Sequence, residues 1–332
     1  MPSSEVRLER VYACKEAFLA LLSNSIANPT ADWPTVRFWT KTSLNRLFKK
    51  IRANLDKSKQ PPSNSELLNW MNKLGLASAV AADGETFHLL EIGASPTSEI
   101  DPLELMMAYE PFGVICYFSA IAYHSLSSQV PSHHHVAVLT DSTRKRDANE
   151  TGLGNADDGP REEMTVNTTS GGKRTRNKPN ALGKVIFSYS GIPYHSTRRM
   201  RRLLPGVQNR SNGPRGRIRI TTYEQTLLDT LHRPQNCGGP AVVLEAWQEA
   251  STSGRLDEER LLGYLNQMDY PSTTRRIGAM LQIMDYTSGA ELKSYLDRAK
   301  RNIDRRSPYS QISLLPGFDY ANLDEEWLVK SP

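Results

Sequence analysis

Two groups of residues have types that could carry metal chemistry. His133–His135 form a run of three histidines, but neighbouring residues of a strand point to opposite faces, so at most two of them could bind one ion. Asp285, Glu291 and Lys293 imitate the pattern of a metal-dependent nuclease, but their stretch is typical of a helix and not of the strand that such enzymes need. We therefore predict no metal, no cofactor and no catalysis by this chain. A metal-dependent nuclease is kept as a further hypothesis for the function. It requires that the protein nick DNA and that Glu291→Ala abolish this activity.

Two further groups of residues are suited to contact nucleic acid, and the first lies in two neighbouring predicted helices. It comprises Arg46, Lys49, Lys50 and Arg52 in one helix and Asn64, Ser65, Asn69, Asn72 and Lys73 in the next. An Asn amide can pair with two positions of an adenine edge, whereas Lys and Arg bind phosphate. We predict that the basic set positions the protein on duplex DNA and that the second set reads bases. The alternatives are a solvated charged face and a surface that docks a protein.

The second group is the basic segment 183–219, which contains nine basic residues and no acidic residue. Its arginines are Arg198, Arg199, Arg201, Arg202, Arg210, Arg215, Arg217 and Arg219. Like charges at this density repel one another, so we expect a polyanionic partner. That partner could be DNA, the acidic face of a protein, or residues 220–332 of the same chain, which hold 12 basic and 16 acidic residues.

The elements around the first group predict a winged helix-turn-helix. The pattern favours an amphipathic helix at 5–22, a second helix at 35–57 that begins after Thr42 or Ser43, and a third that begins at Ser63 or Ser65 and ends at Gly75. The apolar residues expected to face the core are Leu44, Leu47, Phe48, Ile51 and Leu55 in the second helix and Leu67, Leu68, Met71 and Leu74 in the third. Two short strands then flank Asp83-Gly84, a strong hairpin signal. Helices followed directly by a hairpin place the recognition helix just before the wing.

The rest of the chain alternates strands and helices. We predict a helix at 102–109, strands at 133–140, 184–190 and 217–221, and a series of helices after Thr221, followed by an extended, irregular tail. Residues 141–182 have few large apolar side chains, which is typical of a flexible insertion.

The resulting fold class is α/β (α+β). We divide the chain into a winged helix-turn-helix domain at 1–95, a domain with a small mixed sheet at 96–220, and a helical C-terminal region at 221–332.

The composition excludes several classes of protein. The chain has 332 residues, a net charge of +5 and three Cys residues, which are too few and too scattered for a disulfide framework or a cysteine-based zinc site. This favours a reducing compartment, and we expect a cytoplasmic location. No apolar run approaches the roughly 20 residues that span a membrane, and the polar first residues do not resemble a secretory signal. We therefore expect no membrane partner.

The predicted helix after Thr221 contains the most specific motif. Thr221 and Glu224 have the spacing of a capping box, and Asp229 and Arg233 have the spacing of an ion pair on one helical face. Pro234 and the pair Gly238-Gly239 end this helix before the next one begins. From spacing alone, a purely structural role is the favoured interpretation.

The run 220–247 resembles the signature of the AbiEi family of antitoxins, which regulate type IV toxin–antitoxin and phage-defence operons. The residues that match are Glu224, Thr226, Leu227, Asp229, Arg233, Pro234, Gly238 and Gly239. Residues 109–126 resemble the segment that follows the family's winged helix, and 275–284 resemble its Arg-Arg-x-Gly helix. The N-terminal domain and the insertion at 141–182 are longer than in the family's usual pattern.

The resemblance implies an antitoxin with two roles, neither of which requires catalysis. Its winged helix would bind operator inverted repeats and repress its own operon, which requires a dimer or a cooperative pair on DNA. Its C-terminal part would counteract a nucleotidyltransferase-like toxin in an abortive-infection system. The alternative function is that of a protein-interaction subunit in a defence complex, with the winged helix docking a protein.

Overall fold

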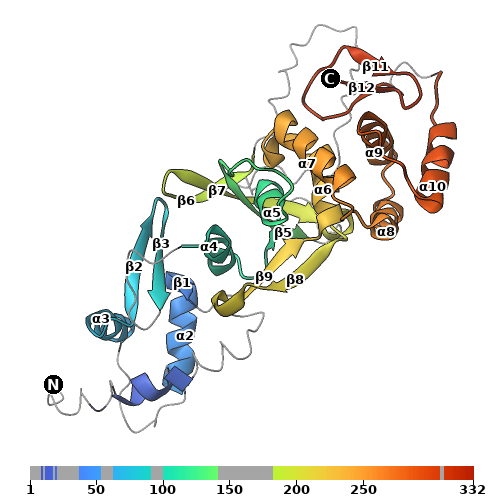
Figure 1. Ribbon diagram of the computed structural model, residues 1–332. Coiled ribbons are helices and arrows are strands. Elements are labelled where there is room, and N and C mark those ends of the chain that lie inside the picture. The colour runs from blue at the N-terminus through green and yellow to red at the C-terminus, as the bar shows by residue number, and fades with distance from the viewer. Residues whose placement is uncertain are drawn as a thin grey trace, which may run out of the picture. The chain divides into compact units, whose positions relative to one another are not determined.

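The computed structural model shows a mixed α/β protein and describes residues 9, 12–17, 19–20, 37–53, 63–90, 100–140, 182–306 and 310–332 (Figure 1). The chain divides into two units. Unit 1 comprises Met1–Gly113, Ile186–Tyr194 and Asn209–Arg219. Unit 2 comprises Val114–Val185, His195–Gln208 and Ile220–Pro332. Most of the predicted insertion, 141–181, lies outside the described residues, and so do parts of the helix predicted at 5–22, of which 12–17 and 19–20 are helical.

Unit 1 begins with a small antiparallel sheet and the helices that cover it. Its elements are β1 (Phe38–Thr40), α2 (Lys41–Ala53), α3 (Asn64–Lys73), β2 (Ala77–Ala82), β3 (Glu85–Leu90) and α4 (Pro102–Tyr109). The strand order is β1-β3-β2, with Phe38 opposite Leu89 and Ala82 opposite Glu85. The last pair confirms that Asp83-Gly84 forms the two-residue turn of a hairpin.

Local signals define both ends of α3. The Ser63 hydroxyl accepts a hydrogen bond from the Glu66 backbone N–H at 3.2 Å, and the Glu66 carboxylate accepts one from the Ser63 N–H at 2.8 Å. This is the capping box that identifies a helix start, so Ser63 is confirmed as the cap. Gly75, with φ of 64°, turns the chain after the helix. For α2 the cap is Thr40 and not Thr42 or Ser43, because its hydroxyl accepts from the Ser43 N–H at 3.2 Å.

The predicted apolar stripes of these two helices form the core of unit 1. Leu44, Leu47, Phe48 and Ile51 of α2 are buried, as are Leu67 and Met71 of α3, and they pack with Trp39, Ala77 and Leu90. Leu74 departs from the prediction because it follows the end of α3, where it is 52% exposed. Leu55 lies outside the described residues.

A six-stranded sheet follows in the chain, in the order β6-β7-β5-β4-β9-β8. Its strands are β4 (Val114–Ile115), β5 (His134–Thr140), β6 (Lys184–Tyr189), β7 (Ile192–Met200), β8 (Val207–Ser211) and β9 (Arg217–Thr221). The strand β4 is antiparallel to β5 and parallel to β9. The segment 191–216, for which the sequence predicts neither helix nor strand, contains β7 and β8. These strands lack the alternating pattern that would have indicated them.

The remaining elements of unit 2 are helices and a second small sheet. They are α5 (Phe118–Tyr123), α6 (Tyr223–His232), α7 (Pro240–Thr252), α8 (Glu258–Met268), α9 (Pro271–Ile283) and α10 (Ala290–Arg301), with β10 (Ile312–Ser313), β11 (Asn322–Asp324) and β12 (Val329–Ser331). The series of helices after Thr221 is confirmed. The prediction of an irregular tail is wrong in part, because β12 of the tail pairs with β10 and β11.

Candidate nucleic-acid interface

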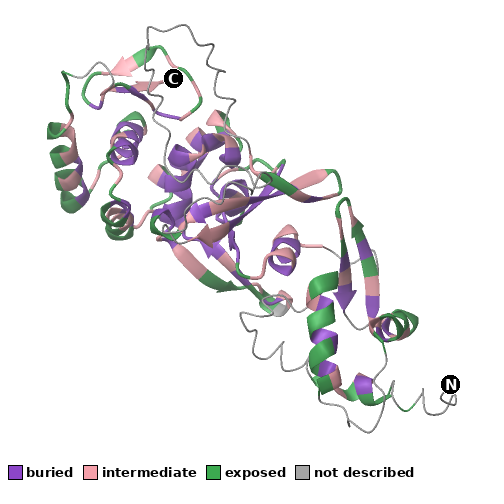
Figure 2. Cartoon of the chain, turned by 180° about the vertical axis from the view of Figure 1, so that it is seen from behind, coloured by how far each residue is buried: buried purple, intermediate pink, exposed green. Residues whose placement is uncertain are grey.

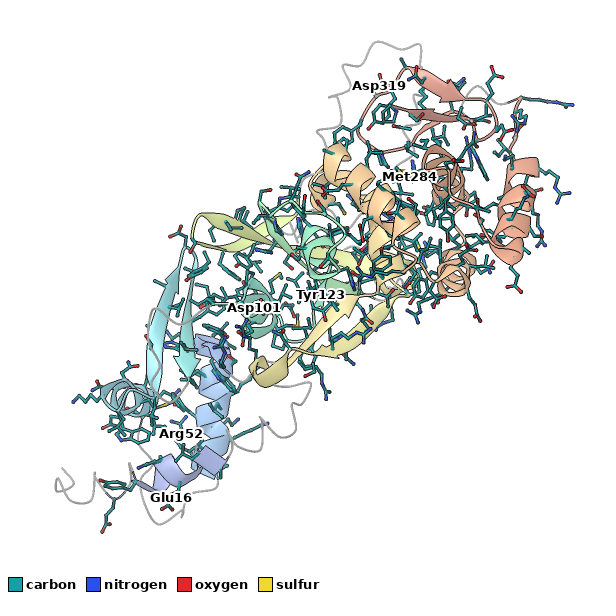
Figure 3. All side chains as sticks on the ribbon, in the orientation of Figure 1. Glu16, Arg52, Asp101, Tyr123, Met284 and Asp319 are labelled. Atoms are coloured by element: carbon teal, nitrogen blue, oxygen red, sulfur yellow. The ribbon has the colours of Figure 1, made fainter. Side chains whose placement is uncertain are left out.

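The basic residues predicted on α2 lie opposite its buried stripe. Arg46, Lys49 and Lys50 are exposed and Arg52, labelled in Figure 3, is half-buried. Sequence reasoning missed Lys41, which is also exposed at the start of the same helix. The available signal was that α2 contains five basic residues and no acidic residue. Such a face repels itself unless an anion neutralises it.

The polar residues predicted on α3 form one stripe. Ser65, Asn69, Asn72 and Lys73 are exposed, while Leu67 and Met71 face the core. Residues three and four apart lie on one side of a helix, so the four polar side chains share a face. A helix of ten residues is about 15 Å long, and the DNA major groove, at about 12 Å wide, admits an α-helix.

Asn64 differs from the other polar residues of α3. Its amide nitrogen donates a hydrogen bond to the Asn45 side-chain oxygen of α2 at 2.5 Å. The bond links the start of α3 to α2. The structure therefore gives Asn64 a positioning role between helices, in addition to the base contact that the sequence indicates.

The tip of the β2–β3 hairpin is paired with another strand of unit 1. The Asp83 N–H donates to the Ser188 carbonyl at 2.8 Å, and the Ser188 N–H donates to the Asp83 carbonyl at 2.9 Å. A Cβ on Gly84 would lie 3.4 Å from the Ile186 carbonyl oxygen, and Phe87 packs edge-on against Phe187 at 4.9 Å. The hairpin tip is therefore held by protein.

The basic segment does not form one exposed surface. Exposed members are Arg201, Arg202, Arg210 and Arg217; half-buried members are Arg198, Arg215 and Arg219. In unit 1, Arg215 pairs at 3.4 Å with Asp101, which caps α4 and is labelled in Figure 3. Arg219 donates to the Phe112 carbonyl at 2.8 Å. Both arginines therefore stabilise contacts within unit 1 as well as contributing positive charge.

Arg199 is not at the surface at all, contrary to the sequence prediction. It is 3% exposed, and its guanidinium donates to the Asp229 carboxylate at 2.8 Å and to the Leu203 carbonyl at 3.2 Å. Gln225 donates to the same Asp229 oxygen at 2.9 Å. Burial raises the pKa of Asp229, and the Arg199 charge and these hydrogen bonds oppose that rise. Asp229 thus pairs with Arg199 of β7, whereas the sequence spacing indicated Arg233.

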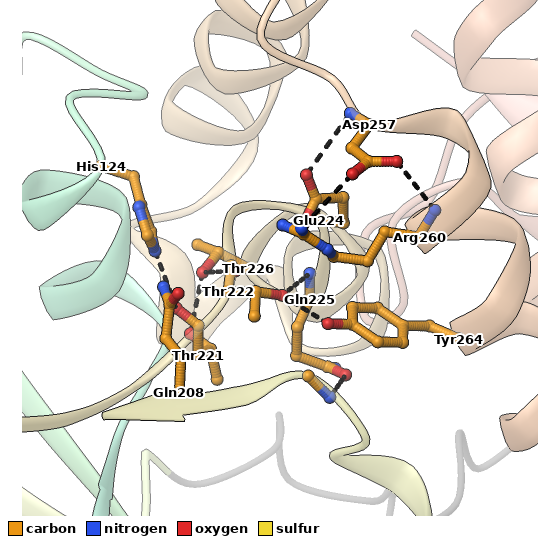
Figure 4. A network of polar contacts seen from close by, with 11 residues as sticks. His124, Gln208, Thr221, Thr222, Glu224, Gln225, Thr226, Asp257, Arg260 and Tyr264 are labelled. Atoms are coloured by element: carbon orange, nitrogen blue, oxygen red, sulfur yellow. Dashed lines mark hydrogen bonds and ion pairs between the residues drawn. The ribbon is translucent and has the colours of Figure 1, made fainter. Parts of the chain in front are cut away.

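The family-like motif on α6 lies inside unit 2. All ten residues of α6 are buried. Its cap is Thr222, one residue later than predicted, and Glu224 accepts from the Asp257 N–H at 3.4 Å and from Arg260 at 3.5 Å (Figure 4). Glu224 therefore bonds with α8 and with Asp257, the cap of α8. The sequence had instead predicted a bond from Glu224 to the start of its own helix.

The Arg-Pro and Gly-Gly parts of the motif shape the connection from α6 to α7. The Arg233 N–H donates to the Asp229 carbonyl at 2.8 Å and closes α6, and Pro234 starts a short 3-10 turn, Pro234–Cys237. A Cβ on Gly238 would lie 2.9 Å from the Phe118 ring, and Gly239, with φ of 90°, caps α7. These residues set the path of the backbone and expose few polar groups.

The Arg-Arg-x-Gly segment of α9 holds the C-terminal sheet. The Arg275 guanidinium donates to the Trp327 carbonyl at 2.9 Å and to the Leu328 carbonyl at 2.8 Å, and Arg276 donates to the Ser313 carbonyl at 2.9 Å. Gly278 leaves room for Trp327, since a Cβ there would lie 2.2 Å from the indole ring. This motif therefore has a structural role as well.

The described part of the chain offers little for metal or membrane chemistry. Within it, no group of three or more His, Cys, Asp or Glu side chains is placed to hold a metal ion. Glu291 and Lys293 lie on the helix α10, as the sequence predicted. No helix in the described ranges has the length and apolar character required to cross a bilayer.

Comparisons with known proteins found likeness among solved structures alone. No family model matches the chain, and no curated protein sequence matches it. A solved structure, that of the RV2827C protein from Mycobacterium tuberculosis, is similar over 93% of this chain and 89% of that chain, with 11% sequence identity and a TM-score of 0.46.

Proposed function

We propose that the β1–β3 part of unit 1 is a winged helix-turn-helix that binds duplex DNA. The order of its elements supports the proposal: β1 leads into α2, α3 follows, and the β2–β3 hairpin completes a sheet in which β3 is central. In such modules the helix before the hairpin enters the major groove. The observation that carries the proposal is the exposed stripe of Ser65, Asn69, Asn72 and Lys73 on α3.

The two helices divide the work of recognition. The stripe on α3 reads base edges, with Asn69 and Asn72 suited to adenine. The basic face of α2, with Arg46 and Lys49 exposed, binds phosphates and fixes the register. Because Asp83 at the hairpin tip is bonded to Ser188, the phosphate contacts depend on α2 more than on the wing.

The resemblance of residues 220–247 to AbiEi antitoxins supports a role for this DNA binding. In this proposal the chain represses its own operon from operator inverted repeats, as a dimer or a cooperative pair, and counteracts a nucleotidyltransferase-like toxin. The motif residues of α6 are buried, so they maintain the fold of unit 2. The exposed arginines Arg201 and Arg202 are then the better contacts for a toxin.

Electrophoretic mobility shifts with the promoter DNA of the operon test the proposal. Lys49→Ala should weaken binding to every sequence equally and lower the salt slope by about one, because one phosphate contact is lost. Asn69→Ala should relax sequence preference, at about 1–3 kcal/mol for a lost bidentate contact. Lys293→Ala, at an exposed position of α10, is the matched control and should change neither.

The outcome that contradicts the proposal is the absence of any shift at low salt. A protein-docking role for the same module is the second candidate. Leu74, an apolar residue directly after α3 that is 52% exposed, is then the side chain expected to contact the partner. Co-purification of the neighbouring gene product without DNA, lost in Leu74→Ser and retained in Lys49→Ala, would favour docking over DNA binding.

A further inference from the structure

Four histidines of unit 2 lie on two adjacent strands of the sheet or directly beside them. His134 and His135 open β5, His133 directly precedes this strand, and His195 lies on β7, which is the neighbour of β5 in the sheet order. The rings of His133, His135 and His195 lie close together. The ring centroids of His133 and His135 are 4.9 Å apart, and the His195 ring lies 5.0 Å from His135 and 6.0 Å from His133.

The three rings are buried, and they differ in how many of their ring nitrogens have a hydrogen-bond partner. His133 bonds at both nitrogens, with the Ser132 hydroxyl and the Asn236 carbonyl, each at 3.1 Å. His195 Nδ1 lies 3.4 Å from the Gly183 carbonyl, but neither its Nε2 nor either nitrogen of His135 has a hydrogen-bond partner among the described residues. His135 is 0% exposed. Buried polar groups normally find partners, so this arrangement requires an explanation.

In the described part of the chain, no carboxylate interacts with these three rings. Around His135 the titratable neighbours are His134 on its own strand, His133 directly before it, His195 on β7, and Tyr117, whose ring meets His135 edge-on at 5.3 Å. The nearby charged pair, Arg199 and Asp229, is neutralised internally, and its guanidinium covers the Tyr117 ring at 5.2 Å. A proton on any of the three imidazoles would therefore be a buried, unpaired charge beside two further imidazoles.

We propose that His133, His135 and His195 form a proton-responsive cluster that keeps β5 and β7 packed in the sheet only while its imidazoles are neutral. The cluster lies beside the family-like motif, since His133 bonds to the Asn236 carbonyl in the turn between α6 and α7. Uptake of protons at mildly acidic pH would thus loosen both the sheet and this turn. The proposal concerns unit 2 and is independent of DNA binding.

The direction of the pH effect follows from burial. Burial lowers the pKa of all three histidines, that of His135 well below 6.5, and neighbouring imidazoles lower the pKa of His135 and His195 further. In the unfolded chain the pKa values return to about 6.5. The unfolded state then binds more protons below that pH, so stability is complete above about pH 6.5 and is lost as the pH falls.

Unfolding of the full chain in denaturant between about pH 8 and about pH 5 tests the proposal. For each proton taken up on unfolding, the unfolding equilibrium constant rises tenfold when the pH falls by one unit. We expect uptake of more than one proton by the wild type, and about one fewer in His135→Phe or His195→Phe, which keep an aromatic ring without a titratable group. Gln208→Ala is the control, because Gln208 has no titratable group and bonds with the Thr221 carbonyl at 3.5 Å outside the cluster, so its loss should leave the slope unchanged.

An unchanged slope in both phenylalanine variants, or an equal loss in Gln208→Ala, would overturn the proposal. If the variants do not fold, nitrogen chemical shifts of the wild-type imidazoles decide: neutral rings at about pH 6 support the cluster, and protonated rings refute it. Zinc chloride is the remaining probe. Zinc that raises the unfolding midpoint of the wild type but not of His135→Phe would refute the proposal by showing that a metal occupies the cluster.

Discussion

The helices α3 and α6 use polar residues in opposite ways. Both have ten residues, but α3 buries only Leu67 and Met71, whereas every residue of α6 is buried (Figure 2). Ser65, Asn69, Asn72 and Lys73 of α3 face solvent, where a partner can reach them. Several polar side chains of α6 instead bond within unit 2, such as Asp229 with Arg199 and Glu224 with Arg260. A specific polar motif can therefore have a structural role as readily as a role in binding.

The largest expected effect comes from breaking the buried pair behind α6. Asp229→Ala should lower the free energy of unfolding by about 3–5 kcal/mol, because it leaves the Arg199 guanidinium buried without a counter-charge. Asp297→Ala, on the exposed side of α10, is the control and should change stability by less than about 0.5 kcal/mol. Equal stability of the two variants in chemical denaturation would show that the α6 motif is not structural.

A smaller loss is expected where α9 meets the C-terminal sheet. Gly278→Ala should destabilise the protein by about 1–3 kcal/mol, because the new methyl group would overlap the Trp327 ring. Gly263→Ala provides a matched comparison, since this glycine of α8 has nothing within 4 Å of its added Cβ and should gain about 0.5–1 kcal/mol from helix propensity. Thermal unfolding measures both, and a stabilised Gly278→Ala would contradict the close packing of Trp327.

The smallest effect tests the exposed helix. Ser63→Ala removes the side-chain cap of α3 and should cost about 1 kcal/mol of stability. Asn72→Ala, on the exposed face, should leave stability within about 0.5 kcal/mol of the wild type. If Asn72→Ala proved as destabilising as Ser63→Ala, the polar stripe of α3 would be part of the fold, as the polar residues of α6 are, and the contrast between the helices would fail.

The candidate interface was largely predictable because its signals are local. Three such signals depend only on residues that are close in the chain. They are the apolar stripe of α2 from Leu44 to Ile51, the Ser63–Glu66 capping box and the Asp83-Gly84 turn. Which side chains of α2 and α3 face outward follows from the same periodicity. Whether they bind DNA stays a prediction, since exposure and charge are shared with ordinary solvated faces.

The helices, the hairpin and the exposed faces of α2 and α3 follow from the amino-acid sequence alone, because periodicity and capping act between residues that are close in the chain. Residues whose partners are distant in the chain could be assigned only from the folded structure. Arg199 looked like part of a basic surface, but it is buried against Asp229, 30 residues away. His195 joins His135 because β7 lies beside β5. Burial and strand pairing assign such partners, and no local pattern records them.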